Sequence, residues 1–202
     1  MDTVPLLVLL SIGSFLLGAL PFSWWIGKLF LRKDIRDFWQ DRNPGATNVF
    51  RAGGRVSGGL AVFLDIAKGA PFVLLTEING YPLSAVYLVG ILAILGHAYS
   101  PFLKLRGGKA TAVTAGVLFA APHKDVLLVA LILILLCFLL TESDSWRIVI
   151  TFSGTLIYTI VAAKGIETIL FVAGILIILA IKNFKGLRVR PKYRSLIKIH
   201  FG

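Results

Sequence analysis

Long apolar runs separated by short polar stretches dominate the chain. Several approach the roughly 20 residues that an α-helix needs to cross a bilayer, and they are continuous rather than alternating, unlike the strands of a membrane β-barrel. The pattern predicts an all-α integral membrane protein with about seven transmembrane helices. The expected spans are residues 6–26, 60–75, 83–103, 111–121, 126–140, 148–163 and 167–181. Pro21 predicts a kink in the first span, and the short fourth span, stopped by Pro122, is expected to cross only in part.

The lysines and arginines fall almost entirely on one side of this topology. Residues 28–55 hold seven of them, residues 104–109 three, the 140–148 connection one, and residues 182–198 seven. Because basic residues are retained on the cytoplasmic side, the bias predicts an outside N-terminus and a cytoplasmic C-terminus. In a bacterium this membrane would be the plasma (inner) membrane. Without internal repeats or linkers, residues 1–202 are expected to form one domain.

Composition narrows the classes of ligand. The chain is 57% hydrophobic with a net charge of +11, and its basic residues lie between apolar runs. Anionic lipid headgroups or a phosphorylated substrate therefore fit better than nucleic acid. The single cysteine, Cys137, can form no intrachain disulfide. The sequence has no metal-ligand motif and no phosphate-binding loop of the ATPase type, so neither a metal site nor ATP hydrolysis is expected. It indicates no oligomeric state.

Two polar stretches on the predicted cytoplasmic side carry candidate chemistry. Gly107, Gly108 and Lys109 form a basic turn, in which a glycine pair leaves backbone N–H groups open and the lysine adds a charge suited to phosphate. The alternative is a hairpin turn whose lysine only follows the charge bias. The second stretch begins at Asp41 and offers small and amide side chains with an arginine that can grip phosphate. Its candidate ligands are Asn43, Gly45, Thr47, Asn48 and Arg51, and its alternative is an ordinary polar loop.

Three ionisable residues lie within the predicted spans. Asp65 and Lys68 share one face of a helix and can pair, either as a structural ion pair or as part of a site. His97, near the cytoplasmic end of the third span, is a candidate polar contact to a ligand. Its alternative is a packing residue with satisfied hydrogen bonds.

Together these motifs resemble the bacterial acyl-phosphate:glycerol-3-phosphate acyltransferase family, the PlsY type. The resemblance rests on Asn-Pro-Gly-Ala-Thr-Asn-Val-Phe-Arg at 43–51, Leu-Asp-Ile-Ala-Lys-Gly at 64–69, and the segment from Gly96-His97 to Arg106-Gly-Gly-Lys109. The family's seven-helix, N-out topology also agrees.

The resemblance implies transfer of a fatty acyl group from acyl phosphate to the 1-hydroxyl of glycerol 3-phosphate, giving lysophosphatidate and phosphate in phospholipid synthesis. It implies no cofactor and no covalent acyl-enzyme. Arg51, Lys109 and the Gly107 and Gly108 backbone would hold phosphate, and Asp41, Lys109 and Asn183 would occupy catalytic positions. Asn43, Gly45, Thr47, Asn48, Asp65, Lys68 and His97 would contribute to substrate binding.

The chain departs from the family pattern at several positions. Where the family reads Gly-Ser-Gly, this chain has Gln40-Asp41-Arg42, so that a carboxylate stands in a serine position. It could repel a phosphate, act as a base or pair with Arg42. Ala110 replaces a glycine, and Ala180 stands where the family has a histidine three residues before Asn183. Two alternatives to a divergent enzyme therefore stay open: a catalytically impaired relative that binds phosphorylated lipid or partners an active paralogue, and a small-anion transporter suggested by Asp65 and Lys68.

Overall fold

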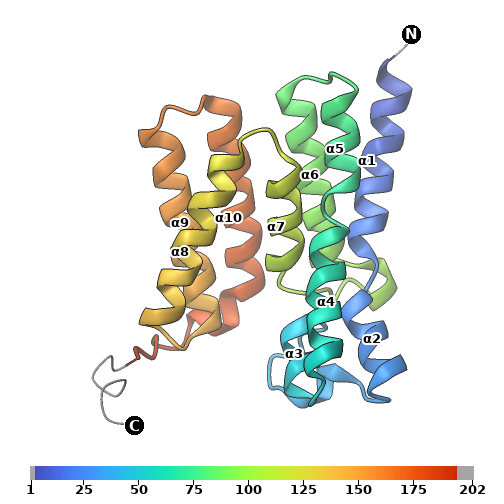
Figure 1. Cartoon of the computed structure of the whole chain (residues 1–202), viewed down its shortest axis with the longest axis vertical. Coiled ribbons are helices and arrows are strands. Elements are labelled where there is room, and N and C mark those ends of the chain that lie inside the picture. Colours follow the sequence, from blue (N-terminus) through green and yellow to red (C-terminus); the bar gives the residue numbers. More distant parts are fainter. Residues whose placement is uncertain (1–2, 195–202) are drawn as a thin grey trace. The chain divides into compact units, whose positions relative to one another are not determined.

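The computed structural model describes residues 3–194, and these form ten α-helices and two short 3-10 helices (Figure 1). The all-α prediction is confirmed for this range. Lys198, which belongs to the predicted C-terminal basic stretch, lies outside the described residues, as does His200. The chain divides into two compact units, residues 1–122 and residues 123–202. The expectation of a single domain stays a prediction.

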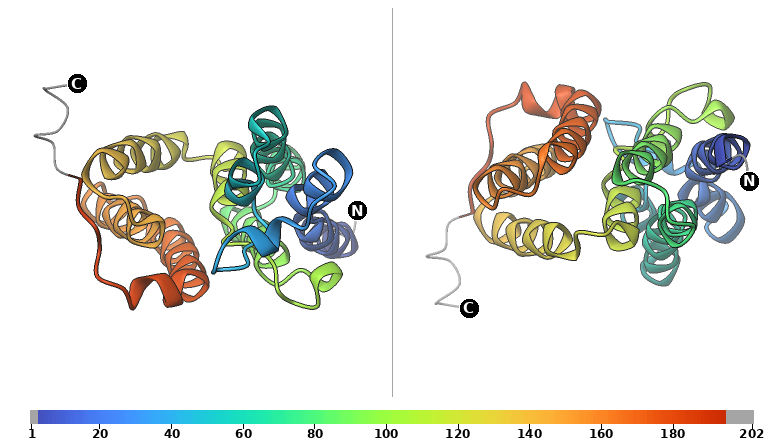
Figure 2. Two further views of the ribbon diagram at one scale, coloured as in Figure 1. Left: turned by 90° about the horizontal axis from the view of Figure 1, so that it is seen from below. Right: turned by 90° about the horizontal axis from the view of Figure 1, so that it is seen from above.

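The first unit is a helix bundle with a polar end. Its elements are α1 (Thr3–Ala19), α2 (Phe22–Phe30), η1 (Ile35–Phe38), α3 (Ala46–Arg51), α4 (Arg55–Ala67), α5 (Pro71–Ile78), α6 (Leu83–Ala98), η2 (Pro101–Leu103) and α7 (Thr111–Ala120). Helices α1, α5 and α6 pack together, and α7 packs against α4 and α6 (Figure 2). In Figure 1, α2, α3 and the start of α4 gather at the end of this unit opposite the beginning of α1.

The first predicted span is interrupted at Pro21, where the sequence predicted a kink. Proline has no N–H and cannot continue the helical hydrogen bonds, so α1 ends at Ala19 and α2 begins at Phe22. The carbonyl groups left at the break accept hydrogen bonds from side chains at the ends of other helices. Lys68 Nζ donates to the Leu20 carbonyl at 2.7 Å, and Ser100 Oγ donates to the Ala19 carbonyl at 2.6 Å. The break is thus stabilised inside the bundle rather than by water.

Helices α1 and α6 approach closely because glycines face the contact. A Cβ on Gly18 would clash with the Ala93 backbone, and one on Gly96 would clash with the Phe15 carbonyl. Small residues at a helix interface let two backbones approach, which is how apolar helices pack where lipid gives no hydrophobic drive. The contact fixes the position of the C-terminal end of α6, against which Gly107 and Gly108 pack.

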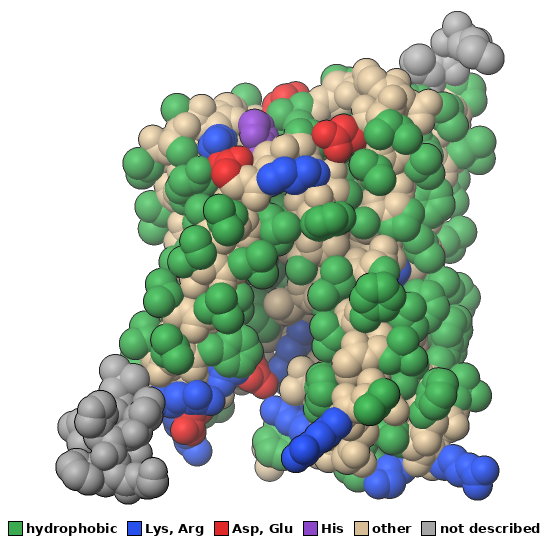
Figure 3. Space-filling view, viewed as in Figure 1, with side chains coloured by type: hydrophobic (Ala, Val, Ile, Leu, Met, Phe, Trp, Pro, Cys, Tyr) green, Lys and Arg blue, Asp and Glu red, His purple; other side chains and the backbone are tan. Residues whose placement is uncertain are grey.

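Four helical stretches are long and apolar enough to cross a membrane: Val4–Phe30, Arg55–Ile78, Leu83–Leu103 and Ile166–Leu187. Exposed leucine, isoleucine and phenylalanine side chains cover their flanks, as Figure 3 shows for one face. Helix α7 has ten residues and rises about 15 Å, half of a hydrocarbon core of roughly 30 Å, and its partial crossing stays a prediction. The total of seven spans and their orientation stay predictions.

The polar stretch 28–55 is more ordered than its composition suggested. The sequence placed it between two spans with no predicted helix, and the structure contains η1 and α3, both anchored by apolar side chains. Ile35 and Val49 are fully buried and pack in one cluster with Ile26. Single apolar residues in a polar stretch give no periodic signal, and helices this short are stable only through such packing.

The second unit is a set of three helices, α8 (Lys124–Leu140), α9 (Asp144–Val161) and α10 (Ile166–Leu187), with α9 packed against both others. Arg147, expected in a connection, lies in the first turn of α9 and is 7% exposed. It donates to the Thr141 carbonyl at 2.7 Å and pairs with Asp144 at 2.9 Å. The α8–α9 connection also bonds to the segment after α10, through Glu142 N–H to the Lys192 carbonyl at 2.8 Å.

Candidate phosphate site

An ion pair joins the two candidate stretches. Lys109 Nζ lies 2.8 Å from Asp41 Oδ2, so the second motif meets the first across 68 residues of sequence. Their side chains are 22% and 27% exposed, which leaves the pair open to solvent on one side. Of the alternatives for Asp41, the structure has an ion pair, but its partner is Lys109 rather than Arg42. The reason is tertiary, because the end of α6 carries the 107–109 turn to the loop before α3.

Asn48 organises the first motif. This fully buried residue of α3 donates from Nδ2 to the Asn43 carbonyl at 2.8 Å and to Asp41 Oδ1 at 3.4 Å. Its Oδ1 accepts from Arg51, one turn further along α3, at 3.1 Å. The Asn43 N–H also donates to Asp41 Oδ1, at 3.1 Å. Loop and helix are therefore tied into one polar network around the Asp41 carboxylate.

Arg51 and Gly45 lie at the two ends of α3, the helix that carries Asn48. The Arg51 guanidinium stacks on the Trp39 ring, 4.1 Å from its centroid, which fixes its direction by a cation–π contact. Gly45 is the N-cap of α3. Thr47, on the same helix, is exposed to solvent. The sequence analysis missed Trp39, although an aromatic residue beside an arginine-bearing motif is a usable signal.

The glycine pair has a steric role that the sequence did not reveal. A Cβ on Gly107 would clash with the His97 and Ala98 carbonyls, and one on Gly108 would clash with the His97 ring. The Gly108 N–H donates to the His97 carbonyl at 3.1 Å. The expectation that the pair leaves its N–H groups open is therefore wrong for Gly108. What the glycines permit is close packing of the turn on α6, which directs Lys109 toward Asp41.

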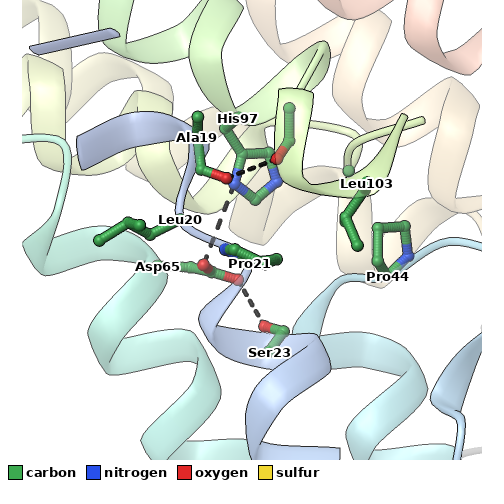
Figure 4. Close-up of a pocket in the computed structure, with 10 residues that line it drawn as sticks. Ala19, Leu20, Pro21, Ser23, Pro44, Asp65, His97 and Leu103 are labelled. Carbon is green, nitrogen blue, oxygen red and sulfur yellow. Dashed lines mark hydrogen bonds and ion pairs between the residues drawn. The ribbon is translucent and has the colours of Figure 1, made fainter. Parts of the chain in front are cut away.

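A second polar cluster lies at the Pro21 break. Asp65 pairs with Lys68 at 2.7 Å, accepts from Ser23 Oγ at 2.5 Å, and lies 3.9 Å from His97 Nδ1. Asp65 and Lys68 are almost completely buried, so the predicted pairing is confirmed and it satisfies both charges. Figure 4 shows Asp65 between Ser23 and His97. Ser23 was missed, because one serine in an apolar run gives no signal.

A small cavity lies beside the Asp65 cluster and reaches one residue of each candidate motif, Pro44 and Gly108. Its volume is about 10 Å³, enough for one water-sized guest, and Asp65, His97, Pro44 and Gly108 contribute to its lining (Figure 4). Both candidate motifs therefore border the Asp65 cluster. The cavity is too small for a substrate, so substrate access is expected on the open side, where Lys109 and Asp41 meet solvent.

Two of the departures from the family pattern share a backbone feature. Arg42 has φ +48° and Ala110 has φ +63°, in the left-handed region that glycine adopts most readily. The resemblance implies glycine at both positions, and the left-handed backbone seen here is one that glycine adopts readily. Ala110 is buried and caps α7, directly after Lys109.

Asn183 belongs to the second unit and is engaged there. It is 2% exposed on α10, accepts from Ser145 Oγ at 3.1 Å and donates to the Leu179 carbonyl at 2.9 Å. The bond to Ser145 ties α10 to α9, whereas the bond to Leu179 lies within α10. The other candidate residues all lie in the first unit.

Electrostatics favour an ionised Asp41. Burial raises the pKa of its carboxyl, but the hydrogen bond and charge of Lys109, with the Asn43 and Asn48 donors, outweigh burial and hold the pKa below its usual range. An ammonium and two N–H donors thus surround one anion. Arrangements of this kind bind phosphate or offset negative charge in a transition state. Among the described residues, no group of three or more histidine, cysteine or acidic side chains could hold a metal ion.

Fold and site thus define a helical membrane protein with a polar network around the Asp41 carboxylate at the end of a bundle. The chain matches the family model described as glycerol-3-phosphate acyltransferase over residues 8–190, and it belongs to this family. The predicted family resemblance is confirmed.

Curated relatives and solved structures agree with this membership. Glycerol-3-phosphate acyltransferases of Staphylococcus aureus strains Newman and JH9 are each 43% identical over 136 residues, which cover 63% of this chain and 66% of the relative. The chain thus matches about two thirds of their length. The crystal structure of PlsY (YgiH), an integral membrane glycerol 3-phosphate acyltransferase, is similar in its glycerol 3-phosphate form, with a TM-score of 0.83 and 26% identity. Its lysophosphatidic acid form gives a TM-score of 0.81, and both comparisons cover 97% of this chain and 99% of the other.

Proposed function

We propose that this protein transfers a fatty acyl group from acyl phosphate to the 1-hydroxyl of glycerol 3-phosphate, forming lysophosphatidate and phosphate in phospholipid synthesis. Family membership supports the reaction class, and the similar structure in a glycerol 3-phosphate form supports the acceptor. The observation that carries the proposal here is the set of donors around Asp41: Lys109 Nζ, the Asn43 N–H and the Asn48 amide. Together they form a site for an anion.

The proposed acyl transfer requires the protein mainly to position the two substrates and to offset the negative charge of their phosphates. The acceptor hydroxyl attacks the acyl carbonyl, the bond from the acyl carbon to the phosphate oxygen breaks, and the hydroxyl proton leaves on the released phosphate. Lys109 and Arg51 offset the negative charge of both phosphates, and positioning supplies much of the rate. No acyl-enzyme and no cofactor takes part in this scheme.

The residue roles belong to the proposal. Asp41, Lys109 and Asn183 are assigned to catalytic positions. The ion pair between Asp41 and Lys109 supports the assignment of these two residues to one site. Substrate binding is assigned to Asn43, Gly45, Thr47, Asn48, Arg51, Asp65, Lys68, His97, Gly107 and Gly108. Of these, Asp65 and Lys68 act through the bundle, because their charges already satisfy each other.

We further propose a plasma-membrane protein with seven spans, an outside N-terminus and a cytoplasmic active face. The four long apolar stretches support membrane insertion. In the first unit, exposed arginines and lysines of residues 28–55 lie at the polar end that carries the candidate site. Because basic ends stay on the cytoplasmic side, this supports a cytoplasmic site.

Purified protein supplied with acyl phosphate and glycerol 3-phosphate tests the reaction. We expect lysophosphatidate to form, and Lys109→Ala to lower kcat at least about 100-fold, the usual loss when one charge-stabilising donor is removed. Acyl-CoA and acyl carrier protein serve as alternative donors. If the wild-type protein binds its substrates but turns over no faster than Lys109→Ala, the enzymatic proposal is contradicted.

One alternative has a specific observation behind it, namely a catalytically impaired relative that binds phosphorylated lipid or partners an active paralogue. Ala180 stands in the histidine position and Asp41 in the serine position of the resembling family. This alternative predicts glycerol 3-phosphate binding without acyl transfer. A transporter is less favoured, because the Asp65–Lys68 pair that suggested it has a structural explanation.

A further inference from the structure

The carboxylate of Asp41 is surrounded as a bound anion would be. Its Oδ2 lies 2.8 Å from Lys109 Nζ. Its Oδ1 accepts from the Asn43 N–H at 3.1 Å and from Asn48 Nδ2 at 3.4 Å. Both oxygens are therefore used, by three donors from three positions in the sequence. The chain places one of its own anions on the groups proposed to hold phosphate.

These donors would serve a phosphate equally well. A phosphate oxygen accepts from an ammonium, an amide and a backbone N–H, as a carboxylate oxygen does. Two anions do not share the same donors at low cost, because like charges at contact distance repel. A phosphate that binds Lys109 must therefore replace the carboxylate or stay beside it at a penalty.

The surroundings of the pair permit replacement. Asp41 lies in the loop between η1 and α3, and the two side chains are 27% and 22% exposed. A partly exposed ion pair contributes little free energy. Opening the Asp41–Lys109 pair therefore costs less free energy than binding of a phosphate dianion to Lys109 and Arg51 releases. The buried Asp65–Lys68 pair offers no such exchange, since both of its side chains are at most 2% exposed.

We propose that Asp41 is an internal anionic ligand of the phosphate site, which occupies Lys109 until a substrate phosphate displaces it and so sets the affinity for that phosphate. The inference rests on the proposed function and deepens it. It assigns to Asp41 the control of affinity, and it predicts that a neutral side chain at position 41 makes the site bind phosphate more tightly.

Binding of inorganic phosphate to the purified full-length protein, measured by calorimetry, tests the proposal without any turnover. Asp41→Asn keeps the size of the side chain and removes its charge, and Asp41→Ser installs the residue of the resembling family. For both variants we expect the Kd for phosphate to fall about fivefold, the factor that a pair worth about 1 kcal/mol gives. Separate KM values for glycerol 3-phosphate and acyl phosphate show which substrate phosphate takes the place of Asp41.

Asp125→Asn is the matched control. Asp125 also pairs with a lysine, Lys164, at 2.7 Å, but in the second unit. We expect its phosphate Kd to equal that of the wild type. A similar tightening in this control would assign the effect to overall charge and overturn the proposal.

A second measurement uses the wild-type protein, so that it does not depend on a variant folding. Carbodiimide coupling of carboxylates, read by mass spectrometry, reports how accessible each one is. Added phosphate should raise the labelling of Asp41 relative to Asp125, because displacement frees the Asp41 carboxylate. Unchanged relative labelling of Asp41 at saturating phosphate would contradict displacement.

The outcomes separate this proposal from the proposed function. If Asp41→Asn leaves the phosphate Kd unchanged or raises it, and the wild-type protein transfers acyl groups, the internal-ligand role alone is overturned. A loss of kcat at unchanged affinity would assign Asp41 to proton transfer and also overturn it. Failure of the wild type to transfer acyl groups, with tighter phosphate binding in the variants, overturns the reaction and leaves the internal ligand standing.

Discussion

At the scale of single residues, Ala110 shows how a substitution can keep a turn at an energetic cost. The residue follows Lys109, is 1% exposed and has φ +63°. An L-residue with a Cβ costs roughly 1–2 kcal/mol in this region, and glycine avoids most of that cost. The sequence indicated only that a glycine was missing. The reason that glycine suits the position, a left-handed backbone before α7, is visible only in the fold.

We expect Ala110→Gly to stabilise the protein by about 0.5–1 kcal/mol, since relief of the left-handed strain exceeds the extra chain entropy that glycine loses on folding. The thermal unfolding midpoint in detergent should rise. Ala121→Gly, at the other end of α7, is the control. Ala121 is equally buried but has φ −66°, so glycine should lower the midpoint there. Equal shifts in both variants would refute the strain argument.

Asp34 gives the stability a dependence on pH. The hydrogen bond from Arg36 holds the pKa of this carboxyl far below its ordinary value of 3.8, against the opposing effect of burial. A lowered pKa means that the stabilisation is complete above about pH 5 and is lost progressively as the pH falls toward the folded-state pKa. We expect Asp34→Asn to be less stable than the wild type by about 1–2 kcal/mol at pH 7, because the variant loses charge-assisted hydrogen bonds from Arg36, which contribute more than an exposed ion pair does.

Thermal unfolding of both proteins at pH 7, 5, 4 and 3 measures this effect. The gap in midpoint should be constant down to pH 5 and should narrow below pH 4. Asp37→Asn, which changes an exposed carboxylate of the same 3-10 helix, should follow the wild type. A gap that stays the same down to pH 3 would show that Asp34 stabilises by its shape rather than its charge.

At the scale of elements, Lys68 joins three helices at one point. It ends α4, pairs with Asp65 at 2.7 Å, and donates to the Leu20 carbonyl at the break between α1 and α2. The sequence predicted the Asp65–Lys68 pair, because a spacing of three residues is local. It did not predict the hydrogen bond to the Leu20 carbonyl, 48 residues away. This bond satisfies a carbonyl group that the helix break at Pro21 leaves without an intrahelical donor.

We expect Lys68→Met to destabilise the protein by about 3–5 kcal/mol, because it leaves the Asp65 carboxylate buried without its partner and Leu20 without its donor. Denaturant or thermal unfolding in detergent measures the loss. Adding Asp65→Asn should recover part of it, since the unpaired charge is then gone. Lys28→Met, which breaks a surface pair with Asp34 at 3.4 Å, should cost less than about 1 kcal/mol. A comparable loss in both lysine variants would contradict the role of burial.

At the scale of the whole molecule, the orientation is open to a direct test. With Cys137 replaced by alanine, single cysteines can be placed at exposed positions and labelled on intact cells with a membrane-impermeant maleimide. Asn79→Cys and Ala162→Cys should be labelled from outside, whereas Gln40→Cys and Arg188→Cys should react only after the cells are opened. The reverse pattern would contradict the N-out topology. Labelling of Asn79 and Gln40 from the same side would contradict the number of spans between them.

The sequence by itself determined the helical class, most helix positions and the family. Apolar runs and motif order are local properties, and they survive without knowledge of contacts. Helix α3 and the anchoring of η1 by Ile35 were not readable, because isolated apolar residues carry no period. Only the tertiary structure decided the partners of charges that lie far apart in the sequence. Asp41 meets Lys109 because Gly107 and Gly108 pack on α6, and electrostatic partners are set by distance in space, which the sequence does not contain.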